Sequence, residues 1–298
     1  MAVFSPPACA QQATETDTAE TDTADTADTA QVAPLWTATA SAGLSDRDDG
    51  PDGSWQALSL SRTVGRGYVR GTLMRYHGTL TQADLALPSD YYVGTLGAGG
   101  NFDNWVVDGW ASYGRQDYGR ITTSQGSRAS TGAKGSDYYA AGGDFGRVVP
   151  LGRRWFLTST VAASFAQGKL LRPAPTEAAG NPDLRDLETE EPTWSASAVA
   201  RIDHAFGASG EHYMGLSLSR NWTSNGLSQL WLRPGHDAGT GLPFRLDSKH
   251  YADSWLEVGA TANMKLTKSL YLDLFATRGF GLKAGDTTSA GITLRRTF

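Results

Sequence analysis

The chain has 298 residues, of which 19% are charged, 10% are aromatic and 35 are glycine. No run of about 18 apolar residues occurs, which excludes a membrane-spanning helix. One cysteine, five scattered histidines and a net charge of −5 argue against a disulfide framework, a metal site and a nucleic-acid-binding surface, and we expect no cofactor.

The first residues resemble the end of a secretory signal peptide. Ala8, Cys9 and Ala10 have the small-x-small pattern of a cleavage site, but the basic and apolar regions that should precede them are missing. A signal remnant, a disordered terminus and, less readily, lipidation of Cys9 are the alternatives. Residues 14–30 cycle through Thr, Asp, Ala and Glu without a large apolar residue. We therefore expect a disordered acidic leader over 1–33 and one folded domain over 34–298.

Within 34–298 the dominant pattern is the alternation of apolar and polar residues with period two, which predicts β-strands. Near the end of the chain, for example, Leu270, Leu272 and Leu274 alternate with Tyr271 and Asp273. The alternation predicts strands at 36–46, 54–64, 67–79, 91–102, 105–119, 136–148, 154–168, 194–206, 212–226, 249–265, 269–281 and 286–298.

The lengths of these strands and of their connections point to a membrane. The strands are roughly 10 to 15 residues long, whereas globular strands have about 5–6 residues and membrane strands need about 9–11. Short links such as Gly65-Arg66 and Thr267-Lys268 alternate with longer polar ones, notably 122–135, 172–193 and 227–249. Tight turns at one end and long loops at the other are typical of outer-membrane barrels. We expect an all-β fold, a transmembrane antiparallel β-barrel of about twelve strands, surrounded by lipid in the bacterial outer membrane.

The last residues favour insertion by the barrel assembly machinery. Ile292, Leu294 and Phe298 share one strand face, interrupted by the polar Arg296, and the chain ends on an aromatic residue of that face. We predict these three apolar residues to be the assembly signal. Six tryptophans near predicted strand ends would lie at the membrane interfaces, with core packing in a soluble barrel as the alternative: Trp36, Trp105, Trp155, Trp194, Trp222 and Trp255.

Two stretches resemble one known family. Within Trp255–Phe298, the segments LEVGATANMKLTKSLYLDLFATRGFG and SAGITLRRTF are similar to the end of an autotransporter translocator domain, and Gly142–Gly168 (GGDFGRVVPLGRRWFLTSTVAASFAQG) resembles an inner hairpin of that family. The resemblance implies a secretion barrel. Autotransporters export a passenger of hundreds of residues and thread a helix through the barrel, whereas a short leader precedes Trp36. The expected role is therefore a translocator or anchor with little or no passenger.

One segment invites comparison with an enzyme. Residues 221–226 (NWTSNG) share Ser-Asn-Gly with outer-membrane phospholipases, in which a histidine two residues before the serine acts as its base. Ser224 has lipid-facing parity, but Trp222 stands where the base would be. Because a serine without a general base is not activated, we expect the beginning of a loop with an interfacial tryptophan, no catalytic residue and no enzyme.

Eight charged residues have inward parity: Arg70, Asp108, Asp144, Arg201, Asp203, Glu257, Lys265 and Asp273. Charges inside a barrel need water or an opposite charge. They would line the hydrated pore of a passive, porin-like channel for small solutes, or form an ion-pair network that closes the lumen, which their mixed signs favour. A second acidic set lies in 172–193 and is expected in a solvated loop, with a partner or cation site as the alternative: Glu177, Asp183, Asp186, Glu188, Glu190 and Glu191.

Overall fold

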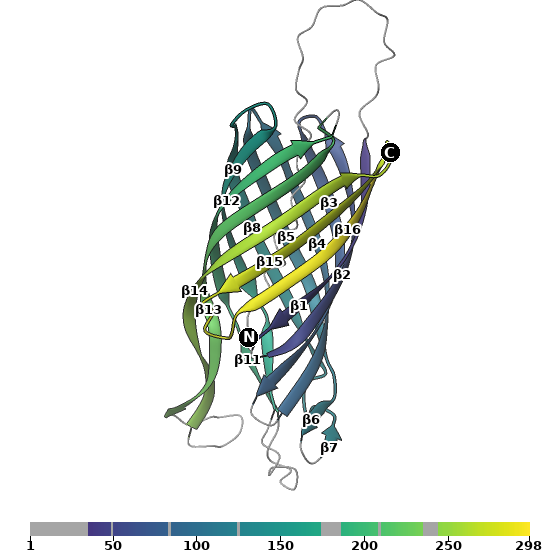
Figure 1. Ribbon diagram of the computed structural model, residues 1–298. Helices are drawn as coiled ribbons and strands as arrows, with labels where there is room; N and C mark the ends of the chain where they lie inside the picture. The colour runs from purple at the N-terminus through teal and green to yellow at the C-terminus, as the bar shows by residue number, and fades with distance from the viewer. Residues whose placement is uncertain are drawn as a thin grey trace, which may run out of the picture.

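The computed structural model is a closed antiparallel β-barrel of twelve strands (Figure 1). It describes residues 35–48, 50–82, 85–123, 126–173, 186–207, 210–234 and 244–298, so the predicted leader at 1–33 lies outside the described residues. The barrel strands are β1 (Trp36–Arg47), β2 (Gly50–Val64), β3 (Gly67–Gln82), β4 (Leu85–Phe102), β5 (Trp105–Tyr118), β8 (Gly135–Pro150), β9 (Trp155–Gln167), β12 (Thr193–Phe206), β13 (His212–Pro234), β14 (Phe244–Lys265), β15 (Leu270–Phe280) and β16 (Thr287–Thr297). Pairing of β1 with β16 closes the ring.

All twelve predicted strands are present, and the main differences lie at their ends. β13 and β14 continue past the predicted limits because their pairing resumes after an irregularity between Thr223 and Leu227. Four further short strands fall in segments predicted as loops: β6 (Ile121–Thr123), β7 (Gly126–Arg128), β10 (Lys169–Arg172) and β11 (Leu187–Glu190). β6 and β7 extend the sheet from β4, whereas β10 and β11 pair only with each other.

The two ends of the barrel differ in their connections. The short links lie together at the end where β16 finishes, which is the upper end in Figure 1 and is called the short-turn end below. Asp103 and Asn104 form a two-residue turn there with φ values of 54° and 71°, the left-handed conformation that tight hairpins need. The opposite, long-loop end carries β6, β7, β10 and β11. Short turns face the periplasm in outer-membrane barrels.

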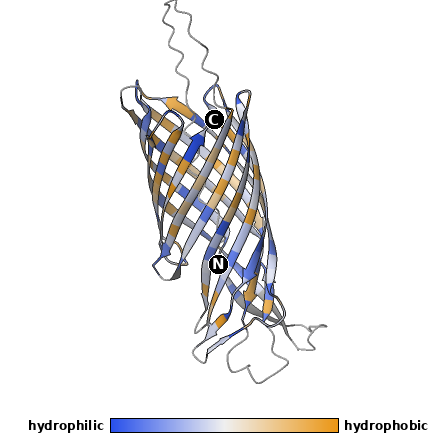
Figure 2. Ribbon diagram, turned by 90° about the vertical axis from the view of Figure 1, so that its right-hand side faces the viewer, coloured by the Kyte–Doolittle hydropathy of each residue, from blue (hydrophilic) through white to orange (hydrophobic). Residues whose placement is uncertain are grey.

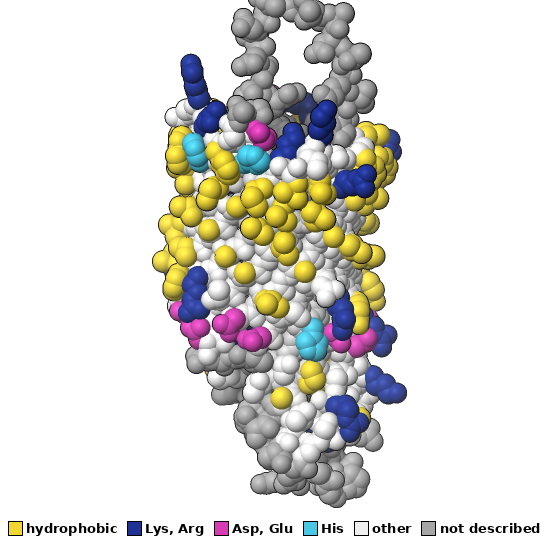
Figure 3. Space-filling model, turned by 45° about the vertical axis from the view of Figure 1, so that its right-hand side comes forward, with side chains coloured by type: hydrophobic (Ala, Val, Ile, Leu, Met, Phe, Trp, Pro, Cys, Tyr) yellow, Lys and Arg dark blue, Asp and Glu magenta, His cyan; other side chains and the backbone are white. Residues whose placement is uncertain are grey.

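The outward face of the barrel is apolar. Leu73 and Leu96 are 70% and 74% exposed, and Leu44, Leu58 and Leu216 lie on the same outer surface. Apolar and polar residues alternate along the strands in Figure 2, and Figure 3 shows a band of hydrophobic side chains between two charged rims. An exposed apolar surface of this extent requires an apolar surrounding. No helix in the described ranges is long and apolar enough to cross a membrane.

Candidate functional site: the barrel interior

The first inward ion pair joins β3 to β5 over the strand between them. Arg70 Nη2 lies 3.7 Å from Asp108 Oδ1, and the Tyr68 hydroxyl donates a hydrogen bond to Asp108 Oδ2. On β4, Gly99 lies beneath this group: an added Cβ would stand 2.9 Å from Asp108 Oδ2 and 3.0 Å from Tyr68 Oη. The missing side chain of Gly99 therefore makes room for the polar group.

A second ion pair is formed within β12. Arg201 Nη2 lies 2.6 Å from Asp203 Oδ1, two residues further along the same inward face. Gly215 of β13 is the register partner of Asp203, and an added Cβ there would collide with Asp203 Oδ1 and stand 3.0 Å from Arg201 Nε. A glycine on the neighbouring strand thus accommodates this pair as well.

The third group lies at the short-turn end of β14, β15 and β16. Arg295 Nε lies 3.6 Å from Asp273 Oδ2, and the amide of Asn263 donates to Asp273 Oδ1. The Arg295 guanidinium lies 4.6 Å above the ring of Tyr271, and Lys265 Nζ lies 5.9 Å from the same ring. Arg295 was not among the predicted lumen residues, although its place between outward Leu294 and Arg296 is a signal that assigns it inward.

The remaining two predicted residues lie apart from these pairs. Asp144 of β8 is the register partner of Asp108, so two carboxylates face each other on neighbouring strands. Glu257 lies on β14 between Ser219 and Gly279, and among the described residues it has no ion-pair partner. The structure therefore brings Arg70 to Asp108 and Arg201 to Asp203. A lumen-lining role for all eight stays a prediction.

From the short-turn end toward the long-loop end, the side chains on the inner wall change from ion-paired residues to serine and threonine hydroxyls and then to aromatic rings. Cross-strand hydroxyl pairs join Thr72 to Ser59 at 3.0 Å, Thr95 to Ser112 at 2.7 Å and Thr293 to Ser41 at 3.0 Å. Beyond them, Trp55 and Phe275 stack with their ring centroids 6.0 Å apart. The two rings lie over Gly43 and Gly291, which are register partners on the strands between them.

The β10–β11 hairpin crosses the long-loop end of the barrel. On one side Leu171 packs in a fully buried cluster with Leu87 of β4 and Ile121 of β6, against Leu80 of β3. On the other side Arg172 Nη2 donates to the hydroxyl of Ser228 on β13 at 2.6 Å. Strands β4 and β13 are five steps apart in one direction around the ring and seven in the other. The contacts of the hairpin therefore lie on nearly opposite sides of the mouth.

A buried carboxylate, Glu191, fixes the hairpin to β13 and β14. Its oxygens accept hydrogen bonds from Ser228 Oγ at 3.0 Å and from Asn225 Nδ2 at 2.9 Å. Arg172 Nη2 lies 3.4 Å from Glu191, and His250 Nε2 lies 3.1 Å away. Burial lowers the pKa of Arg172, while Glu191 opposes that shift. Charged side chains that are buried away from water need opposite charges or hydrogen-bond partners of this kind.

A second buried carboxylate, Asp186, holds the loop that contains β7. Arg128 donates to it with both terminal nitrogens, at 2.8 and 2.7 Å, and the backbone amide of Thr131 donates at 2.6 Å. The hydrogen bond to Asp186 raises the pKa of Arg128.

The expectation of a solvated acidic loop is therefore wrong for Asp186 and Glu191, because both carboxylates are buried and have cationic partners. Their partners Arg128 and Arg172 are not adjacent in sequence, so the acidic pattern did not reveal them. Glu188 accepts a hydrogen bond from Tyr118, Glu190 lies 3.5 Å from Gln167 Nε2, and the predicted Glu177 and Asp183 lie outside the described residues. No group of three or more potential ligands is arranged to hold a metal in the described ranges.

The predicted outward residues have three different surroundings. Ile292, Leu294 and Phe298 are exposed on the outer face, and Phe298 exchanges two backbone hydrogen bonds of 2.9 Å with Trp36; their role in assembly stays a prediction. The hydroxyl of Ser224 accepts a hydrogen bond of 2.8 Å from the backbone amide of Trp194. Trp255 does not lie in an outer girdle: it is half-buried beside Gly279 on the inward face, opposite in parity to the exposed Leu256.

A closed barrel with an apolar outer face, tight turns at one end and longer loops at the other is an outer-membrane β-barrel, so the protein resides in the bacterial outer membrane.

No family model and no curated protein matches the sequence. Solved structures with the same fold include the translocator domain of the autotransporter NalP from Neisseria meningitidis (TM-score 0.58, 16% identity, 89% of this chain and 88% of that one). They also include the β-domain of the Bordetella autotransporter BrkA (0.54, 14%, 89% and 100%) and an outer-membrane channel from Pseudomonas putida F1 (0.54, 10%, 93% and 100%). At these identities the likeness shows the fold alone, an outer-membrane β-barrel that translocator domains and a channel share.

Proposed function

We propose that the chain acts as an autotransporter-like translocator or membrane-anchor barrel and not as an enzyme. The observation that carries this proposal is the β10–β11 hairpin, whose contacts with β4 and β13 lie on nearly opposite sides of the long-loop mouth. A packed, ion-paired element across the exit would obstruct the passage of small solutes through an open channel. An anchor needs only a stable wall, and a translocator needs a mouth that is closed at rest.

The topology supports the same proposal. β1 begins at the short-turn end, where Trp36 pairs with Phe298. β1 therefore starts at the periplasmic rim, and its Thr39 is the register partner of Arg295, which is paired with the inward Asp273. We expect insertion to require the barrel assembly machinery, which would act on the last strand, β16, whose apolar residues face outward.

A passive channel is the second candidate, because the ion pairs lie along the wall. Arg201 and Asp203 are on one strand, and Arg70 meets Asp108 over β4, so neither pair needs to bridge the lumen. The cross-strand hydroxyl pairs between the ions and the rings would suit a hydrated interior for small solutes.

Single-channel conductance in planar bilayers separates the two candidates. The purified full chain is compared with a variant in which residues 169–191 are replaced by a short Gly-Ser linker, and with a control shortened only within 175–184, which keeps both hairpin strands. We expect small or rare openings for the full chain and the control, and a steady, larger conductance without the hairpin. Equal, steady conductance in all three would favour the channel and overturn the anchor proposal.

A further inference from the structure

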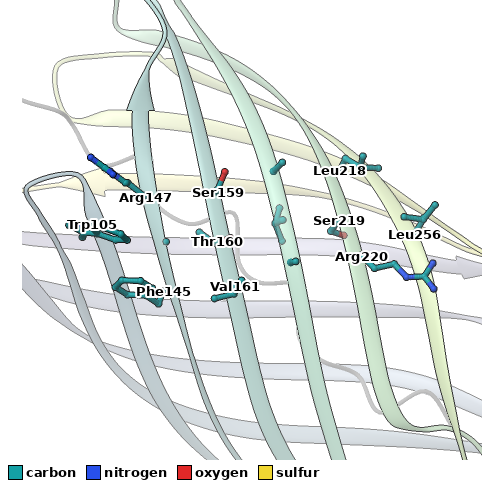
Figure 4. Close-up of a pocket in the computed structure, with 14 residues that line it drawn as sticks. Trp105, Phe145, Arg147, Ser159, Thr160, Val161, Leu218, Ser219, Arg220 and Leu256 are labelled. Atoms are coloured by element: carbon teal, nitrogen blue, oxygen red, sulfur yellow. The ribbon is translucent and has the colours of Figure 1, made fainter.

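The lipid-facing surface of the barrel is hollowed by a groove of about 540 Å³ across β5 to β14 (Figure 4). Small side chains form its floor, among them Ser159 and Ala200. Trp105 and Phe145 stand at one side, stacked with centroids 4.9 Å apart at an interplanar angle of 16°, and Leu218 stands at the other side. The groove is long, apolar and open to the membrane.

One end of this groove carries an arginine without an anionic partner. Arg147 lies on β8 close to the short turns, with its guanidinium carbon 5.2 Å from the centre of the Trp105 ring. Arg153 and Arg154 are exposed in the turn that follows β8. None of the three has an acidic partner among the described residues, and Asp103, in the turn before Trp105, is paired with Arg66 at 2.6 Å.

Several arginines at the long-loop end, by contrast, are already in ion pairs. Three arginines there are paired with carboxylates: Arg75 with Asp90 at 3.0 Å, Arg115 with Asp117 at 3.0 Å and Arg278 with Asp48 at 2.7 Å. Arg220, at the far end of the groove, donates to the hydroxyl of Ser254 at 2.7 Å. The positive charges of Arg147, Arg153 and Arg154 therefore remain available to an anion at the periplasmic interface.

The groove runs from the membrane interface toward the hydrocarbon core. Trp105, Arg147, Ser159, Ala200 and Leu218 form one continuous row of register partners across five strands. Since strands in such barrels tilt by about 35–45° from the membrane normal, a row perpendicular to them climbs from the interface into the hydrocarbon core. An acyl chain attached to a headgroup at Arg147 would follow the same path.

We propose that this groove binds an anionic phospholipid of the periplasmic leaflet, with an acyl chain in the groove and its phosphate on Arg147. A guanidinium pairs with phosphate through parallel hydrogen bonds, and one arginine near a charged membrane surface contributes roughly a fivefold change in affinity. Arg153 and Arg154 would add weaker, screened attraction. The inference depends on the membrane location of the barrel and not on its role in translocation.

The test uses the full chain, reconstituted in nanodiscs with equal amounts of phosphatidylglycerol and phosphatidylcholine. Lipids that remain bound after transfer to detergent are counted by native mass spectrometry. We expect phosphatidylglycerol to be enriched, Arg147→Gln to lower that enrichment about fivefold, and Ala198→Phe, which fills the floor, to reduce the number of retained lipids. Arg115→Gln, an outward but paired arginine at the other end, is the matched control and should change nothing.

Two results would overturn the proposal: unchanged enrichment in Arg147→Gln, or an equal loss in Arg115→Gln, which would indicate attraction by net charge. Heat-modifiable migration on gels confirms that each variant is folded. Conductance is measured independently, so a failure here and a failure of the proposed function are distinguishable.

Discussion

At the scale of single residues, the inner wall depends on glycines that face polar groups. Gly215 faces the Arg201–Asp203 pair, and an added Cβ would also stand 2.8 Å from Thr261 Oγ1. We expect Gly215→Ala to lower the free energy of unfolding by about 1–3 kcal/mol, because the added methyl group overpacks the site. Urea unfolding in lipid vesicles measures this change.

The chain offers a matched control for that substitution. Gly109 lies on the outward face of β5, and an added Cβ there meets nothing within 4 Å. Gly109→Ala should change the free energy of unfolding by no more than about 0.5 kcal/mol. Similar losses for both variants would show that the space beneath the ion pair is not the cause.

Outward leucines give a second residue-scale prediction, in which depth decides the effect. Leu274 lies near the middle of β15 and faces lipid, whereas Leu272 lies two residues nearer the short-turn end. Leu274→Arg should cost about 2–4 kcal/mol, and Leu272→Arg less, since the penalty for a charge falls toward the interface. The same unfolding measurement checks the order. A larger cost at Leu272 would mean that the bilayer midplane is placed wrongly along the strand.

At the scale of elements, the long-loop end is held by the two buried carboxylates. Asp186→Asn should loosen the loop of β7. The substitution removes the negative charge from a pair with Arg128 in which the carboxylate side chain is wholly buried. We expect trypsin to cleave after Arg128 at least about tenfold faster in the reconstituted variant, because removing one partner of a buried pair is strongly destabilising.

Asp137→Asn is the control for the loop experiment, because Asp137 is exposed and makes one 3.2 Å hydrogen bond, with Tyr113, among the residues that the structure describes. Its cleavage rate should match that of the unaltered chain. If Asp186→Asn were also unaffected, the pair with Arg128 would not be what holds the loop.

At the scale of the whole molecule, the closure of the barrel depends on its last strand. Phe298 is exposed on the outer face and bonds with the backbone of Trp36 across the closing seam. We expect deletion of Phe298 to reduce membrane insertion far more than deletion of residues 14–30. Heat-modifiable migration and protease protection in cell membranes measure the inserted fraction. Equal effects of the two deletions would contradict the assignment of Ile292, Leu294 and Phe298 as the assembly signal.

The sequence by itself determined the twelve strands, their faces and the different connections at the two ends. It did so because a side chain in a strand faces one of two sides, and a barrel in lipid needs an apolar residue at every second position. Asp203, Leu218 and Ile292 could be assigned to a face from their immediate neighbours alone.

Only the tertiary structure decided which residues meet. Arg70 beside Asp108, Arg128 beside Asp186 and Leu171 against Leu87 are contacts between segments far apart in the chain. Alternation fixes the face of each side chain but leaves open which strands pair and which residues lie opposite each other. The acidic set at 186–191 illustrates the limit: its composition indicated solvation, but two of its carboxylates are buried beside arginines. Arg128 comes from the loop of β7, and Arg172 comes from the opposite strand of the same hairpin. The lipid groove likewise exists only because strand pairing aligns small residues between Trp105 and Leu218.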